Sequence, residues 1–112
     1  MKKWLSDIRK GSVKLSLLSL INERERYGYE IIRELKKRTD AALIIKEGNL
    51  YPALHKLESQ NLVKSFWKEV EPGVPPRKYY KITKKGRENL DEMIKEWKKF
   101  TLSLNNLLKN EK

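Results

Sequence analysis

The chain has 112 residues, of which 38% are hydrophobic and 37% charged, and its formal net charge is +11. This length predicts one domain, and the basic balance favours an acidic partner, either nucleic acid or a membrane surface. Cysteine is absent, which excludes disulfides, thiolate metal sites and cysteine nucleophiles. No apolar run approaches the roughly 20 residues of a membrane helix, and no signal peptide is evident, so we expect a cytoplasmic protein.

Apolar residues at helical spacing predict two helical regions in the first third of the chain. Residues 1–10 form a short basic helix with one apolar face, and Gly11-Ser12 predicts a break followed by an N-cap. The first full helix is therefore expected over residues 12–23. A second amphipathic helix is expected over residues 27–38, with charged residues between its apolar positions.

Leucines at i, i+4 and i+7 predict a third helix after an apolar connection. Asn49 is a suitable cap and would place Pro52 in the first turn, where no N–H is needed. An earlier start at Glu47 is the alternative, and it would make Pro52 a mild kink. Asn61 suits the left-handed position that closes the helix.

A β-hairpin is predicted next, because residues 62–70 alternate with strand period and residues 77–83 are rich in aromatic and β-branched side chains. A proline-rich turn joins them. Tyr79 and Tyr80 point to opposite faces of a strand, so we expect one in the core and the other half-exposed. Trp67, like Trp4 near the N-terminus, is expected to be a packing residue.

A long amphipathic helix is predicted from Thr83 or Lys84 onward. About 25 helical residues span roughly 37 Å, more than the small domain that they leave, and their apolar stripe would be exposed in a monomer. We therefore expect self-association as a two-fold dimer. The predicted dimer residues are Leu90, Met93, Ile94, Trp97, Thr101, Leu104, Leu107 and Leu108.

The order of elements predicts a mainly α fold with a small β-hairpin, in which a winged helix-turn-helix precedes a long C-terminal dimerisation helix. Residues 1–83 would form the DNA-binding domain with an N-terminal helical arm, and residues 84–112 the dimerisation helix. In this motif the third helix enters the major groove and the hairpin touches the flanking backbone. A two-fold dimer would match a pseudo-palindromic operator.

The placement of charge favours duplex DNA over a merely solvated surface. Residues 77–87 contain six cations and no acid, on the returning hairpin strand and the next helix start. Some alternatives stay open: Asn49 contacts DNA or caps the helix, Tyr51 is exposed or in the core, and His55 faces DNA or is a plain surface residue. On charge and position, the candidate DNA contacts are Lys46, His55, Lys56, Arg77 and Lys78.

Three blocks of sequence resemble one known family. Residues 27–31 (YGYEI), 47–58 (EGNLYPALHKLE) and 77–86 (RKYYKITKKG) are similar, in order and spacing, to those of the PadR transcriptional regulators. The resemblance implies a cytoplasmic, homodimeric repressor of promoter DNA, often released by a small aromatic, drug-like or phenolic ligand. In the reading helix and the wing it implies DNA contacts at Asn49, Tyr51, His55, Lys56, Arg77 and Lys78. It also implies that Trp97 faces its symmetry mate across a dimer pore and stacks on flat ligands; packing between subunits is the alternative role for this residue.

Other functional classes fit less well. With a single histidine, no cysteine and no glycine-rich phosphate loop, the sequence indicates neither an enzyme nor a metal or cofactor site. A winged-helix RNA-binding protein is disfavoured because the aromatic residues fall mainly on predicted inner faces, whereas RNA readers expose them. A helical module that binds a different protein through the long helix stays open.

Overall fold

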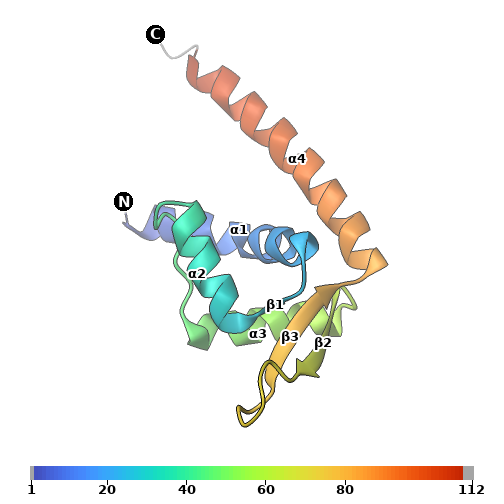
Figure 1. Cartoon of the computed structure of the whole chain (residues 1–112). Helices are drawn as coiled ribbons and strands as arrows, with labels where there is room; N and C mark the ends of the chain where they lie inside the picture. The colour runs from blue at the N-terminus through green and yellow to red at the C-terminus, as the bar shows by residue number, and fades with distance from the viewer. Residues whose placement is uncertain (1, 110–112) are drawn as a thin grey trace.

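The computed structural model describes residues 2–109, and it contains the predicted winged helix-turn-helix followed by a long helix. In chain order the elements are α1 (Lys2–Glu23), β1 (Arg26–Tyr27), α2 (Gly28–Arg38), α3 (Glu47–Ser59), β2 (Val63–Lys68), β3 (Arg77–Ile82) and α4 (Lys84–Lys109). The strands form one antiparallel sheet in the order β1-β3-β2. Figure 1 shows α1, α2, α3 and the sheet gathered together, with α4 projecting away from the side on which the hairpin tip lies.

The core lies where the second half of α1 meets α2, α3 and the sheet. The leucine stripe of α3 is buried, as its spacing predicts, and it packs with apolar side chains of α1 and β2. Residues that are 2% exposed or less include Leu17, Leu18, Ile21, Ile31, Leu50, Leu54, Leu62, Val63 and Leu90. The first turns of α4 join this core, whereas its later turns extend beyond it (Figure 1).

The predicted break at Gly11-Ser12 is wrong, because α1 runs without interruption from Lys2 to Glu23. The Ser12 hydroxyl donates to the carbonyl of Arg9 (2.9 Å), so this side chain bonds back to the preceding turn instead of capping a new helix. Gly11 is exposed, and a Cβ added to it would meet nothing within 4 Å. A glycine in a solvent-facing helix position costs about 1 kcal/mol relative to alanine, which a long helix tolerates.

The third helix follows the alternative start rather than the Asn49 cap. It begins at Glu47 with Lys46 as N-cap, and the N–H groups of Asn49 and Leu50 both donate to the Lys46 carbonyl (2.9 Å each). Pro52 consequently lies inside the helix and has no N–H to offer. The prediction for Asn61 is confirmed, because its φ is +62° just after the helix.

The short strand β1 was not predicted, and it changes the environment of the hairpin. Tyr27 pairs with Tyr79, and their rings meet edge to face with centroids 5.4 Å apart. Phe66 stacks on Tyr79 from the other side at 6.0 Å. Tyr79 is therefore only 9% exposed, and Tyr80 on the other face belongs to the core at 3% exposure, which corrects the prediction that one would be half-exposed.

The start of α4 is fixed against the hairpin by close backbone contact. The Thr83 hydroxyl accepts a hydrogen bond from the Gly86 N–H (2.9 Å) and donates to the carbonyl of Asn61 (2.7 Å). A Cβ on Gly86 would lie 2.1 Å from the carbonyl oxygen of Leu62, so this position requires glycine. The direction in which α4 leaves the domain is therefore set by its first turn.

Several large apolar side chains remain exposed. Trp4 is 63% and Trp67 is 69% exposed, so neither of these expected packing residues is covered by the described part of its own chain. Within residues 2–109 no helix is both long and apolar enough to cross a membrane.

Candidate nucleic-acid interface

The outward face of α3 is formed by small and polar residues. Its buried stripe leaves Gly48, Pro52, His55, Lys56 and Ser59 exposed. At about 100° per residue these five positions lie opposite the leucines. A Cβ on Gly48 would meet nothing within 4 Å, so a neighbouring backbone can approach this first turn closely.

The candidate residues of α3 divide between this face and two flanks. Tyr51 is 42% exposed and lies on the flank toward the hairpin, where it lines a groove with Trp67 and Lys78. Asn49 lies on the opposite flank, in a hollow with Arg9 of α1. The candidate residues of α3 therefore do not form a single cluster.

Lys56 also leans toward α1, where a second hollow of about 240 Å³ contains Lys10 and Lys14. Lys46, the N-cap of α3, is exposed. The basic N-terminal segment and the α1 side of α3 therefore form one cationic surface. Gln60 also lines the second hollow, and its buried side-chain oxygen Oε1 accepts no hydrogen bond from residues 2–109.

Tyr51 is held in place by the start of α2. Its hydroxyl and ring lie directly over Gly28, where an added Cβ would be 2.5 Å from the hydroxyl oxygen. Partial burial, together with the negative charge of Glu47, raises the pKa of Tyr51 above its usual range. The phenol therefore stays protonated at neutral pH and can donate a hydrogen bond to a phosphate oxygen.

The hairpin supplies cations that are backed by aromatic rings. The guanidinium of Arg77 lies 4.6 Å from the centre of the Tyr27 ring, and the ammonium of Lys78 lies 5.8 Å from that of Tyr80. Arg33 of α2 donates to the Tyr27 hydroxyl (3.1 Å). Ring faces attract cations without neutralising them, so these positive charges stay available to an anion.

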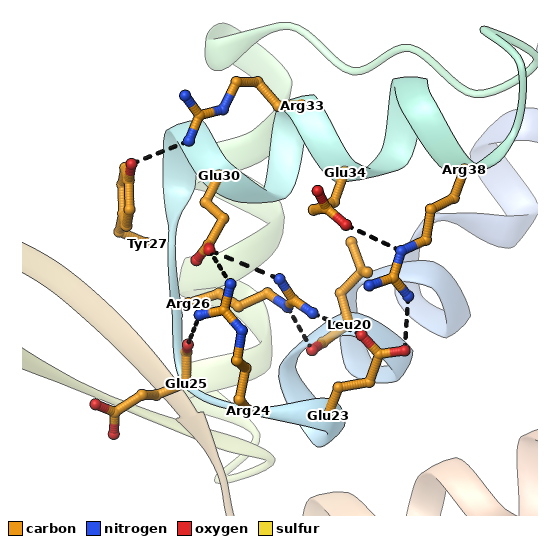
Figure 2. A network of polar contacts seen from close by, with 10 residues as sticks. All are labelled: Leu20, Glu23, Arg24, Glu25, Arg26, Tyr27, Glu30, Arg33, Glu34 and Arg38. Atoms are coloured by element: carbon orange, nitrogen blue, oxygen red, sulfur yellow. Dashed lines mark hydrogen bonds and ion pairs between the residues drawn. The ribbon is translucent and has the colours of Figure 1, made fainter.

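A network of ion pairs fixes α2 relative to α1 and β1 (Figure 2). Arg26 is 3% exposed, and it donates to the carbonyl of Leu20 (2.8 Å) and to Glu23 (2.6 Å). Glu30 of α2 pairs with Arg24 and lies 3.8 Å from Arg26.

The network continues along α2. Arg38, near its end, pairs with Glu23 (2.6 Å) and Glu34 (3.0 Å). Its hydrogen bond is the main reason why the pKa of Glu23 lies below its usual range. These pairs hold Glu23, Glu30 and Glu34 beside arginines, whereas Glu25 pairs with Lys68 of the hairpin (2.8 Å).

The connection between α2 and α3 is held at three points. Thr39 accepts a hydrogen bond from the N–H of Leu43 (3.0 Å), and Ile45 is buried. Between them, Arg9 of α1 donates to the carbonyl of Ala42 (2.8 Å). The turn that leads into α3 is thereby tied to the N-terminal half of α1.

Sequence reasoning missed four residues of this surface: Tyr27, Tyr29, Arg33 and Trp67. The block YGYE gave a usable signal, since two tyrosines flanking a glycine at a helix start leave at least one ring at the surface. Trp67 gave no such signal, because alternation along a strand does not tell whether another element covers a given side chain.

The apolar face of α4 begins inside the domain and ends outside it. Leu90 is buried in the chain's own core, and Met93 and Ile94 are partly buried against it. From Trp97 (46% exposed) onward the stripe is exposed. It includes Phe100, which the sequence analysis did not select, as well as Leu104, Leu107 and Leu108. Leu102 is also exposed, but at about 100° per residue it lies on the opposite side of the helix. Thr101 turns its hydroxyl back to the Trp97 carbonyl (2.9 Å).

Comparisons with known proteins agree on one family. A model described as the transcriptional regulator PadR-like family matches residues 17–92. A relative from Lysinibacillus sphaericus, named only as an uncharacterized protein, is 41% identical over 92 residues, which are 82% of this chain and 84% of the relative.

Solved structures of this family are similar over nearly the whole chain. A PadR family transcriptional regulator from Eggerthella lenta DSM 2243 has a TM-score of 0.83 at 31% identity, covering 98% of this chain and 93% of its own. A PadR-like transcriptional regulator from Bacillus cereus strain ATCC 14579 has a TM-score of 0.82 at 33% identity, covering 94% and 99%.

Proposed function

The chain belongs to the PadR-like family of transcriptional regulators, and on that basis we propose that it is a homodimeric repressor that reads a pseudo-palindromic operator in duplex DNA. Members of this family are regulators rather than enzymes, so the surface described above is expected to bind and not to catalyse. In a bacterial cell a regulator of promoter DNA acts on the chromosome in the cytoplasm, and we propose that location for this chain.

The observation that carries the proposal is the position of cations around the exposed face of α3. Arg77 and Lys78 lie on one flank, and Lys46 and Lys56 on the other. Between them, His55 is the polar side chain best placed to reach base edges in a major groove. We therefore assign phosphate contact to the flanking cations and base contact to the outward face of α3.

Fluorescence anisotropy tests this assignment. A duplex from the gene's own upstream region should bind about a thousandfold or more tighter than a shuffled duplex of the same length. Lys78→Gln should weaken binding to both duplexes alike and reduce the salt slope by about two, one for each subunit of the dimer. Lys37→Gln, an exposed cation near the end of α2, is the matched control and should change neither. Equal affinity of the wild type for both duplexes would contradict a specific regulator.

Dimerisation is proposed from the exposed stripe of α4 and the N-terminal half of α1. Trp97, Phe100 and Leu104 on α4 are at least 43% exposed, as are Trp4 and Ile8 on α1. Soluble chains rarely leave a stripe of this extent uncovered, and a second copy covers it with an identical stripe. Of the residues predicted from sequence, Leu90 contributes indirectly, because it anchors the helix in its own subunit.

Light scattering coupled to gel filtration measures this directly. The wild type should have twice the chain mass of 13.3 kDa. Leu104→Glu should shift it toward the monomer, whereas Lys109→Glu, near the helix end, should leave it dimeric. A monomeric wild type would contradict the dimer, and the apolar stripe of α4 would then be free to bind a different protein.

We further propose that a flat aromatic ligand stacks on Trp97 and releases the repressor. The support is an exposed indole in the apolar stripe of α4; packing between subunits is the alternative role of this side chain. Trp97→Ala should abolish quenching by a flat aromatic drug while the dimer persists. Unchanged quenching would assign Trp97 to packing.

A further inference from the structure

The groove between the start of α2, α3 and the loop end of the hairpin strands has features that contact with duplex DNA does not explain. It has a volume of about 540 Å³, within the range of small-molecule sites. We propose that this groove binds a flat aromatic ring joined to a phosphate, such as a nucleotide. The inference rests on the proposed function, since it adds a ligand to the surface assigned to DNA.

The first argument is the number of exposed ring faces. Trp67, Tyr29 and Tyr51 all line the groove, and they are 69%, 58% and 42% exposed. Phosphate contact alone needs cations and hydrogen-bond donors, not an indole. A base or another flat ring stacks on such faces without regard to sequence.

The second argument is the charge of the lining. Arg33, Arg77 and Lys78 contribute three cations, and no acidic residue lines the groove among residues 2–109. Every ion pair within 4.0 Å in that part of the chain involves other cations. Three positive charges in one groove favour a phosphate, which carries about −1.5 to −2 charges at neutral pH, over a single carboxylate.

The third argument is the fixed arrangement of these groups. Arg33 is held by the Tyr27 hydroxyl at 3.1 Å, and Arg77 is held over the Tyr27 ring at 4.6 Å. Gly28 lets the Tyr51 ring pack against the start of α2. Cations and ring faces are thus oriented before a ligand arrives, which lowers the entropic cost of binding.

An aromatic ring joined to a phosphate has two sources: a free nucleotide, and an unpaired nucleotide at the end of a DNA strand. A free nucleotide would occupy Arg77 and Lys78, and would therefore compete with the phosphate backbone of a bound duplex. An unpaired end would instead add affinity to DNA that carries one.

Calorimetric titration with AMP, adenosine and inorganic phosphate tests the shared chemistry. AMP should bind at least about tenfold tighter than either partial probe, because it engages rings and cations at once. Trp67→Ala should weaken AMP binding roughly fivefold or more, the range known for base stacking on aromatic side chains. Trp67→Phe should retain most of the affinity, and Lys37→Gln all of it. Far-ultraviolet circular dichroism confirms that each variant is folded.

Anisotropy with labelled duplexes distinguishes the two sources. Release of a blunt upstream duplex by AMP supports the free nucleotide. Tighter binding of a duplex with a one-nucleotide overhang, lost in Trp67→Ala, supports the strand end. Two results together overturn the proposal. The first is that AMP binds no better than phosphate, or binds Trp67→Ala as tightly as the wild type; the second is that the overhang adds no affinity. Specific binding of the blunt duplex under the same conditions shows that the proposed function survives that failure.

Discussion

Replacing Arg26 by methionine is expected to destabilise the chain more than replacing any other arginine of the ion-pair network. Arg26 is 3% exposed, and its guanidinium satisfies the carbonyl of Leu20 and the carboxylate of Glu23. It also lies 3.8 Å from Glu30, whose side chain is 13% exposed. Methionine fills a similar volume but leaves these acceptors without their donor (Figure 2).

The magnitude follows from what remains after the substitution. Removing one partner of a buried ion pair costs about 3–5 kcal/mol, because the other charge stays buried and unpaired. Here Glu23 keeps Arg38 and Glu30 keeps Arg24, so neither acid is left unpaired. The loss comes instead from the buried Leu20 carbonyl, which costs about 1–3 kcal/mol when unsatisfied, and from the hydrogen bond to Glu23, and together these give about 3 kcal/mol. At about 4 °C per kcal/mol for a chain of this size, Tm should fall by roughly 12 °C.

Thermal unfolding followed by circular dichroism, at one protein concentration, measures the effect. Arg24→Gln is the matched control, because Arg24 pairs with the same Glu30 but is 58% exposed. It should cost less than about 1 kcal/mol. If Arg26→Met melts within about 3 °C of Arg24→Gln, the buried network does not stabilise the fold in the way we describe.

Three further predictions concern the α4 junction, acid stability and salt. Gly86→Ala should destabilise the fold by about 1–3 kcal/mol, because its Cβ meets the Leu62 carbonyl. Gly11→Ala, at an open helix position, should instead stabilise it by up to about 1 kcal/mol. Equal Tm values for the two variants would refute the contact at Gly86. The pKa of Glu58 is held below its ordinary value of 4.5, chiefly by the Ser65 hydroxyl, so its contribution is complete above that pH and is lost as the pH falls through the folded-state value. Urea unfolding should therefore show a larger cost of Ser65→Ala at pH 7 than at pH ~3, and the same cost at both would count against it. Affinity for the upstream duplex should drop by about 10³–10⁵ between 50 and 200 mM salt if a dimer contacts roughly 6–10 phosphates, and a flat salt dependence would exclude that contact.

Periodicity predicted the elements that bury one continuous apolar face. The leucine stripe of α3, the two hairpin strands and the start of α4 all follow from spacing, because each element must bury that face against the same core. The left-handed φ of Asn61 follows from local preference alone.

The errors came where tertiary contacts override local signals. Gly11 and Ser12 resemble a helix break, yet α1 continues because the serine bonds back along the helix. Strand β1 has two residues, too few for a periodic pattern, and its partner Tyr79 is covered by Tyr27 on one side and Phe66 on the other. Such contacts between distant segments leave no periodic trace in the sequence.

The site shows the same division. The cations of the hairpin and of α3 were evident from an acid-free stretch and from helical position, and the structure finds them exposed. The groove could not be predicted, because it joins Tyr29, Tyr51 and Trp67, which come from three elements. Their approach depends on Gly28, whose missing side chain makes room for the Tyr51 ring.

Hydroxyl-radical footprinting on the gene's own upstream region tests the central claim most directly. Two copies of α3 related by a two-fold axis should protect two half-sites whose centres lie about 10–10.5 base pairs, or a multiple of that, apart. Protection should vanish for Leu104→Glu, which removes the dimer, and persist for Lys37→Gln. Uniform weak protection of the whole fragment, or a single protected site that survives loss of the dimer, would contradict a dimeric regulator that reads DNA with paired α3 helices.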